Sequence, residues 1–303
     1  MKREQLRREL AKEVMRLKVD EQVPTYRQLS QRFKSSLGTV SSVMAEFEED
    51  GVVRIERRGW AGTFLHYRDL SRLWSIARNG SPLVIAFPLP STRVCEGLAT
   101  AVKEQLSRSQ IETFLIFLRG SLNRLQALRQ QRCHAVAVSR FAAGLMCGPG
   151  ERPVLELPPR TYIQEHRVFY APGLDPYATN HLRVGMDRSS IDIQCLTELE
   201  FAGKDVQFVD TNYMRYAQML ETRQVDAVIW DIDDTIGRLG VDVKSRQLSG
   251  HVLQQIEYHN TRACFVAGVD DVITETVLIE CLQTDELLAI QGAVIEGSRV
   301  PEY

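Results

Sequence analysis

The sequence predicts an α/β protein in two parts: a small N-terminal unit of helices with a β-hairpin, and a larger C-terminal region of two α/β lobes. First, residues 24–65 change from helical spacing of apolar residues to two short strand patterns. Second, apolar runs alternate with helix-capping residues from Leu83 onward, and this alternation occurs twice. A chain of 303 residues is long enough for both parts.

Three helices are expected before the hairpin. In residues 2–18, leucine and valine recur at helical spacing with lysine and arginine on the other face, which predicts an amphipathic helix. Thr25 is expected to cap a second helix, because its hydroxyl can accept from an unpaired backbone N–H. Ser36 is expected to cap a third helix in the same way, and Gly51 to end it. The first helix would pack behind the other two.

A β-hairpin is expected directly after Gly51. Residues 52–55 begin a strand, a basic turn follows at residues 57–59, and residues 63–65 return as a second strand. Helix, tight turn, helix and hairpin is the winged helix-turn-helix arrangement, which lays its second helix in the major groove of DNA. The sequence therefore predicts a DNA-binding domain in residues 1–66.

Polar and basic side chains of this domain are the candidate DNA contacts. Hydroxyls would face the groove or the phosphates, and cations would neutralise phosphate charge. The charge distribution fits, because residues 1–68 hold 14 Lys and Arg against 10 Asp and Glu, whereas the rest holds 23 against 29. The alternatives are plain solvent-exposed serines and a winged helix that binds protein. The candidates are Arg27, Arg32, Lys34, Ser36, Thr39, Ser41, Ser42, Arg57 and Arg58.

A further set of residues in the N-terminal fifth of the chain forms a family pattern: Pro24, Thr25, Arg27, Leu29, Ser36, Thr39, Val40, Glu48, Gly51, Val53 and Gly62-Thr63-Phe64. By these residues the region resembles the GntR-type winged helix, which implies DNA binding. Leu37 and Gly38 stand where GntR-type proteins usually carry a basic residue, and this departure favours phosphate contacts over base readout. The whole chain, with its particular second half, resembles the YhfZ family of candidate transcriptional regulators.

Residues 67–81 are expected to form a linker helix, in which Leu70, Leu73 and Trp74 make a dimer contact or cover the next domain. The first lobe then follows as strand, helix, strand, helix, strand, which implies parallel pairing with crossover helices. Its strands are expected at residues 83–90, 111–118 and 134–139, and its helices at residues 92–108 and 120–132.

The same order repeats in a second lobe after a proline- and glycine-rich crossing at residues 147–181. The chain is then expected to return to the first lobe. The expected later elements are strands at residues 182–186, 206–210, 226–230, 251–259 and 263–268, and helices at residues 190–200, 212–223, 270–282 and 284–295.

Two similar lobes joined by crossing segments resemble the type II periplasmic-binding-protein-like domain, which regulators of the LysR type use to sense ligands. This resemblance implies an effector-binding domain in residues 82–303. The first lobe would hold about residues 82–160 and 260–303, and the second about residues 165–255.

In such an open sheet, ligands bind beyond the carboxyl ends of the strands, where helix N-termini favour anions. Hydroxyls at helix starts suit a carboxylate or phosphate, and Arg140 or Arg188 would add a charge-assisted bond. Asp231 and Asp233 would instead suit an amine, and hence a zwitterion. The alternative is that each residue merely caps a helix or lies in a solvated loop. The candidates are Ser91, Thr92, Gly120, Ser121, Ser139, Arg140, Arg188, Ser189, Ser190, Thr211, Asn212, Tyr213, Asp231 and Asp233.

An enzymatic alternative rests on residues 228–235 (VIWDIDDT), which resemble the first motif of haloacid-dehalogenase-type phosphatases. There Asp231 would be the phosphoryl-accepting nucleophile and Asp233 the general acid, with Asp270-Asp271 as a metal-binding pair. The motif normally begins its domain, yet only 68 residues follow Thr235. The chain also lacks GxSxG, HExxH and a glycine-rich phosphate loop. We therefore expect no catalytic activity.

Six scattered cysteines form no CxxC pair, so we expect reduced thiols and neither a metal site nor a cofactor. No run of about 18 apolar residues predicts a membrane span, and the charged N-terminus lacks the apolar core of a signal peptide. The sequence predicts a cytoplasmic regulator that binds double-stranded DNA and senses a small polar or anionic ligand. A homodimer is expected because paired half-sites need two-fold symmetry.

Overall fold

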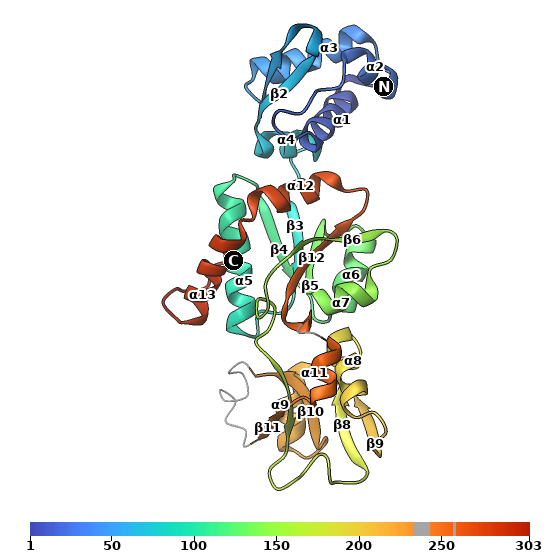
Figure 1. The fold of residues 1–303 in the computed structure, drawn as a ribbon, viewed down its shortest axis with the longest axis vertical. Helices are drawn as coiled ribbons and strands as arrows, with labels where there is room; N and C mark the ends of the chain where they lie inside the picture. Colours follow the sequence, from blue (N-terminus) through green and yellow to red (C-terminus); the bar gives the residue numbers. More distant parts are fainter. Residues whose placement is uncertain (233–242, 257–258) are drawn as a thin grey trace. The chain divides into compact units, whose positions relative to one another are not determined.

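Figure 1 shows the computed structural model, which describes residues 1–232, 243–256 and 259–303. The chain divides into two compact units. The N-terminal unit comprises Met1–Leu83 together with two later segments, Gln105–Phe114 and Asp271–Leu282. The C-terminal unit comprises Val84–Glu104, Leu115–Asp270 and Gln283–Tyr303.

The N-terminal unit contains the predicted winged helix-turn-helix. Thr25 caps α2 in a capping box with Gln28, and Ser36 caps α3 by accepting a hydrogen bond from the backbone N–H of Thr39 (3.1 Å). Gly51 ends α3 with a φ of +69°, which a glycine adopts without strain. The elements are α1 (Arg3–Arg16), α2 (Tyr26–Arg32), α3 (Leu37–Glu49), β1 (Val53–Arg57), η1 (Gly59–Ala61), β2 (Thr63–Arg68) and α4 (Leu70–Ala77).

A helix from the far end of the chain, α12 (Val272–Cys281), belongs to the same unit and packs against α1. The side chain of Arg68 is 4% exposed and donates to Glu280 (2.6 Å) and to the Met15 carbonyl (3.1 Å). Leu73 and Trp74 of α4 are buried, and α4 packs against α1 of the same unit rather than in either of the two predicted ways. The N-terminal unit is therefore completed by residues that come more than two hundred positions later.

The first lobe is built on a five-stranded mixed sheet of order β4-β3-β5-β12-β6. β3 pairs with β5 in parallel, as predicted, and β12 returns antiparallel to β5 and β6. The elements are β3 (Leu83–Phe87), α5 (Arg93–Arg108), β4 (Thr113–Phe117), α6 (Ser121–Arg129), β5 (Ala135–Ser139), α7 (Arg140–Met146), β6 (Glu151–Glu156), β12 (Ala263–Gly268) and α13 (Thr284–Ile295).

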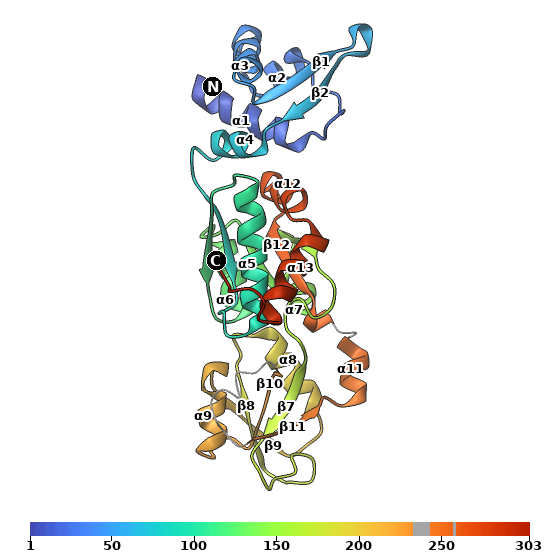
Figure 2. The same ribbon diagram turned by 90° about the vertical axis from the view of Figure 1, so that its left-hand side faces the viewer.

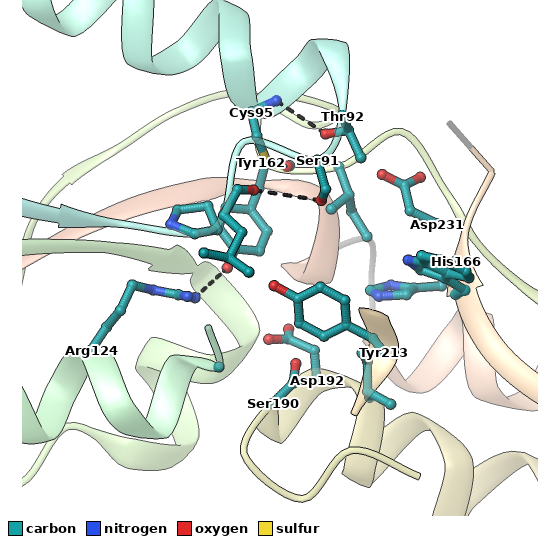
Figure 3. A pocket seen from close by; sticks show the side chains of 16 residues that line it. Ser91, Thr92, Cys95, Arg124, Tyr162, His166, Ser190, Asp192, Tyr213 and Asp231 are labelled. Carbon is teal, nitrogen blue, oxygen red and sulfur yellow. Dashed lines mark hydrogen bonds between the residues drawn. The ribbon is translucent and has the colours of Figure 1, made fainter. Parts of the chain in front are cut away.

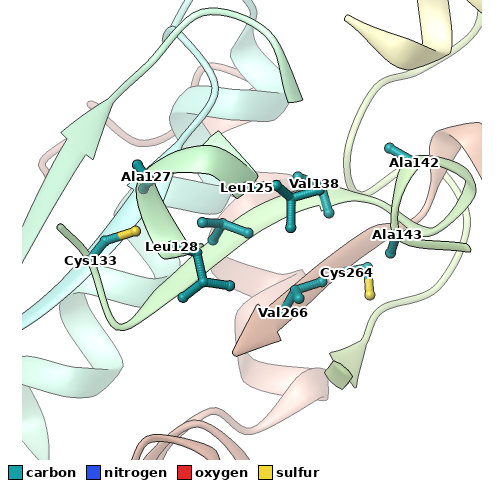
Figure 4. Packing of buried hydrophobic residues seen from close by; sticks show 11 residues of the cluster. Leu125, Ala127, Leu128, Cys133, Val138, Ala142, Ala143, Cys264 and Val266 are labelled. Carbon is teal, nitrogen blue, oxygen red and sulfur yellow. The ribbon is translucent and has the colours of Figure 1, made fainter. Parts of the chain in front are cut away.

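The core of this lobe is a cluster of aliphatic and cysteine side chains between the sheet and helices α6 and α7 (Figure 4). Burial raises the pKa of the Cys133 thiol to about 11, so this thiol stays protonated. On the other side, α13 lies beside α5 (Figures 1 and 2), where Gln291 donates to the Val94 carbonyl (2.9 Å). The six cysteines are free thiols.

The second lobe has a five-stranded mixed sheet of order β11-β7-β10-β8-β9, in which β8 pairs in parallel with β9 and β10. Its elements are β7 (His166–Tyr170), β8 (Leu182–Met186), α8 (Ile191–Glu200), β9 (Val206–Asp210), η2 (Tyr213–Arg215), α9 (Tyr216–Glu221), β10 (Ala227–Asp231), β11 (Lys244–Gln247) and α11 (Gly250–Ile256). The short helix η3 (His259–Thr261) packs against α7 and β5 of the first lobe.

The strand predicted at residues 251–259 is wrong, because helix α11 begins at Gly250 and occupies the described start of this stretch. Val252 and Ile256 lie four residues apart and both are buried in the lobe core, which is helical spacing. The short helix α7 was also not predicted. The two-lobed α/β fold itself is confirmed.

Candidate functional site

A pocket of about 570 Å³, its open mouth included, lies between the two lobes (Figure 3). It opens beyond the carboxyl ends of β3, β4, β8, β9 and β10, which is where an open α/β sheet binds ligands. Its lining residues are Pro88, Leu89, Ser91, Thr92, Cys95, Gly120, Arg124, Tyr162, Ile163, His166, Ser190, Asp192, Ile193, Tyr213, Trp230 and Asp231.

Six of the residues nominated from the sequence line this pocket: Ser91, Thr92, Gly120, Ser190, Tyr213 and Asp231. Thr92 is buried, and its hydroxyl accepts from the backbone N–H of Cys95 (3.2 Å), so it serves as the cap of α5. These six residues lie near strand ends or at helix starts, and the structure brings them together in one pocket.

The other nominated residues lie outside the lining. Arg140 pairs with Glu156 (3.0 Å) and Arg188 with Asp210 (2.6 Å), so neither supplies the expected charge. Ser121, Ser139, Ser189 and Thr211 make contacts within the protein, and Asn212 directly precedes η2. Asp233 and Thr235 lie outside the described residues.

Gly120 brings a loop of the first lobe against a loop of the second. Its φ is +79°, and a Cβ atom there would lie 2.4 Å from the Ser189 carbonyl oxygen. Beside it, Arg119 pairs with Asp187 (2.5 Å), and the hydroxyl of Ser121 accepts from the backbone N–H of Ile191 (3.1 Å). These contacts fix one side of the pocket.

Arg124 is one of the lining residues that sequence reasoning missed, and it is 2% exposed. Its Nε donates to the Ala137 carbonyl (3.0 Å) and its Nη1 to the Leu118 carbonyl (2.7 Å). Its Nη2 donates to the Tyr162 hydroxyl (2.7 Å). Arg124 thus holds Tyr162 in place, in a segment whose prolines gave no signal of a binding site.

Asp192 lies in the first turn of α8 and is 3% exposed. The hydroxyl of Ser139, from the first lobe, donates to its carboxylate. Burial raises the pKa of Asp192 to about 6, and the bond from Ser139 acts in the opposite direction. From the sequence alone, Asp192 resembles an ordinary acidic residue near a helix N-terminus. Its burial could not be predicted, because it depends on a strand that is far away in the sequence.

His166 begins β7 and is buried in the pocket wall. Its Nδ1 lies 2.7 Å from the amide nitrogen of Asn260. Burial lowers the pKa of His166 to about 3, so the imidazole is neutral at physiological pH. It adds a polar group to the pocket without a positive charge.

The candidate DNA-binding surface is the exposed side of α2, α3 and the wing. Arg27, Lys34, Ser36, Ser41 and Ser42 are exposed, and Thr39 is half-buried. Several arginines pair with acids of the same unit: Arg57 with Glu48 (3.0 Å), Arg58 with Glu56 (2.7 Å) and Arg32 with Glu13. At the tip of the wing, sequence reasoning did not single out Trp60, whose side chain is fully exposed.

Asp231 is the nucleophile in the phosphatase alternative. It is buried at the end of β10, where its Oδ1 accepts a hydrogen bond from the backbone N–H of Glu165 (3.3 Å). Asp271, nominated with Asp270 as a metal-binding pair, caps α12 and pairs with Arg78 (2.5 Å). Within the part of the chain that the structure describes, no helix is long and apolar enough to cross a membrane.

Comparison with known proteins places these features in context. A family model described as the YhfZ C-terminal domain matches residues 69–303, and one described as a helix-turn-helix domain matches residues 18–65. The chain is 31% identical over 297 residues to "Uncharacterized protein YhfZ" of Escherichia coli (strain K12), which covers 97% of this chain and 95% of the relative.

Solved structures share the fold of the C-terminal region. YhfZ from Shigella flexneri superposes with a TM-score of 0.60 at 31% identity, over 73% of this chain and 93% of that chain. The GluR0 ligand-binding core, solved in complex with L-glutamate, superposes with a TM-score of 0.50 at 11% identity, over 71% of this chain and 98% of that chain. The helix-turn-helix domain is thus followed by a domain with the periplasmic-binding-protein-like fold.

Proposed function

The chain belongs to the YhfZ family. We propose that it is a DNA-binding transcriptional regulator whose two-lobed domain senses a small polar or anionic ligand. The observation that carries the proposal is that a helix-turn-helix and a pocket lined by both lobes occur in one chain. We further propose a cytoplasmic homodimer, because two winged helices related by a two-fold axis match the half-sites of an operator.

The surface of α3 supports the DNA-binding part of the proposal. Its buried face holds Val40, Val43 and Phe47, which leaves Ser41 and Ser42 exposed on the other face. Small hydroxyl-bearing side chains allow close approach to the groove and can bond to phosphates or base edges. Arg27 and Lys34 would add sequence-independent attraction to phosphates.

Helix α12 supports a link between ligand and DNA. Only the three residues 269–271 separate it from β12, a central strand of the first lobe, and it packs within the N-terminal unit. A ligand that favours one arrangement of the lobes would shift the winged helices through such connections. The size of that shift is limited by the ligand's difference in affinity between the two arrangements.

The test is fluorescence anisotropy of the full chain on duplex DNA from upstream of its own gene, with a random duplex as the control, across a salt series. The proposal expects tighter binding to the upstream duplex, with an affinity that falls steeply as salt rises. Equal or absent binding to both duplexes would contradict it. A phosphatase would instead need Mg²⁺ and lose activity on Asp231→Asn, and a protein-interaction module would not bind duplex in a salt-dependent way.

A further inference from the structure

We propose that the pocket recognises its ligand through a positively charged amine, held by the carboxylates of Asp192 and Asp231 and by neighbouring aromatic rings. This inference rests on the proposed function and names the ligand class for the same pocket. The sequence predicted a small polar or anionic ligand and left an amine, and hence a zwitterion, as the alternative. The side chains that line the pocket favour the amine.

Two carboxylates from different elements reach the pocket. Asp231 ends β10 and is 5% exposed, and Asp192 lies in the first turn of α8. Figure 3 shows both side chains in the pocket together with the ring of Tyr213. Each carboxylate already accepts a hydrogen bond from the protein, Asp192 from the Ser139 hydroxyl and Asp231 from the backbone N–H of Glu165. A bound ammonium would add a charge-assisted hydrogen bond to such a carboxylate.

The positively charged side chain in the described pocket wall already binds protein groups. Among the described lining residues, Arg124 is the single arginine and no lysine is present, and protein oxygen atoms hold the Arg124 guanidinium. His166 is neutral because it is buried. Among the described residues that line the pocket, a purely anionic ligand would therefore meet two carboxylates and no cation that is still available to it.

Aromatic rings complete the expected amine site. Tyr162, Tyr213 and Trp230 line the pocket, and the faces of such rings attract ammonium groups. Burial raises the pKa of Tyr213 to about 12, so its ring is a neutral phenol. The Trp230 ring is held edge-on against Tyr216, with centroids 5.6 Å apart, which fixes its orientation.

The start of α5 indicates where a second, negative group of the ligand would lie. Thr92 caps this sixteen-residue helix and lines the pocket, and backbone N–H groups at a helix start favour an anion. An α-amino acid would place its ammonium at the carboxylates and its carboxylate at α5. Simple amines and amino acids are therefore both members of the proposed class.

The test compares molecules that share one skeleton but differ in charge. Phenethylamine, L-phenylalanine and 3-phenylpropionate form one such set, and the other standard amino acids with their amines and carboxylates extend it. Each is added to the full chain at about 1–10 mM, where ligands with a Kd near 1 mM bind substantially. A rise in melting temperature is followed by titration calorimetry, with inorganic phosphate as a further anion.

The proposal expects at least one amine or amino acid to bind and its matched carboxylate to bind at least about tenfold more weakly. N-acetylation of a bound amino acid, which removes the cation, should abolish binding. Asp231→Asn and Asp192→Asn should each weaken binding about tenfold or more. Asp205→Asn is the matched control, because Asp205 pairs with the exposed His181 and does not line the pocket.

Tighter binding of carboxylates or phosphate than of amines would overturn the proposal, and so would the absence of binding by every amine and amino acid. An Asp231→Asn variant that melts as the natural protein does, yet binds the amine with unchanged affinity, would also overturn it. Failure of the proposed function is distinguishable from failure of this inference. It shows as absent duplex binding in the anisotropy assay, whatever the calorimetry finds about ligands.

Discussion

The winged helix-turn-helix and the pocket differ in how the chain builds them. One continuous stretch, residues 24–65, forms the first, and caps such as Thr25 and Ser36 set where its helices begin. The pocket draws on loops and strands scattered from Pro88 to Asp231. Local signals therefore determine the first site, whereas the second exists only once two sheets have formed.

The largest effect expected from this difference follows Phe47→Ala in α3. The ring is fully buried, and its loss should lower the unfolding free energy of the N-terminal unit by about 3–5 kcal/mol. DNA binding should weaken while an amine that binds the pocket still does so. Calorimetric unfolding and the two binding assays measure this, with Phe114→Ala as the control because that ring is 54% exposed. Equal loss of both activities would show that the two sites unfold together.

A smaller effect is expected from the buried carboxylate of Asp192. Because its folded pKa of about 6 lies above the unfolded value, it contributes stability that is present below pH 3.8 and lost as pH rises through 6. Relative to Asp192→Asn, the natural protein should lose up to about 3 kcal/mol of unfolding free energy between acidic and neutral pH. Denaturant unfolding across this range measures the difference, and a pH-independent result would contradict the shifted pKa.

His166 should show the opposite sign in the same pocket. Its folded pKa of about 3 lies below the unfolded value of 6.5, so the stability it contributes is present above pH 6.5 and lost as pH falls. The unfolding free energy of the natural protein should therefore fall relative to that of His166→Gln by about 2 kcal/mol between neutral pH and about pH 5. Denaturant unfolding at the two pH values measures this. His181→Gln changes a side chain that is 88% exposed and serves as the control.

The smallest effect concerns the cations of the DNA-binding surface. If Arg27 and Lys34 contact phosphates, each change to alanine should reduce the slope of log affinity against log salt by about 0.9. Arg57→Ala should reduce it less, because Glu48 already holds that guanidinium. Anisotropy over a salt series decides this, and an equal loss at Arg57 would mean that DNA displaces Glu48.

Much of the fold follows from sequence because caps and apolar spacing act over a few residues. Thr25, Ser36 and Thr92 cap the helices that were expected to start there. The strand expected at residues 251–259 failed for the same reason, since a short apolar run suits a strand or a buried helix. Only contact with the lobe core decides between them.

The site was predicted in part, and the omissions share one cause. Asp192 is buried by Ser139 of the other lobe, and Tyr162 is positioned by Arg124. Arg140 and Arg188 are suited to an anion by residue type, but they pair with Glu156 and Asp210 instead. The acidic residue with which an arginine pairs depends on the tertiary structure, so residue type and position at a strand end do not predict it.

Because α12 lies near the C-terminal end of the sequence, the ribosome synthesises it long after the rest of the N-terminal unit. Arg68 is made early, but its partner Glu280 follows 212 residues later. At about 5–20 residues per second, the face of the winged helix that α12 covers waits roughly 10–40 s for its partner. In a chain cut short before α12, this face of the N-terminal unit would therefore stay uncovered, and chaperones and proteases could distinguish such a chain from the full-length protein.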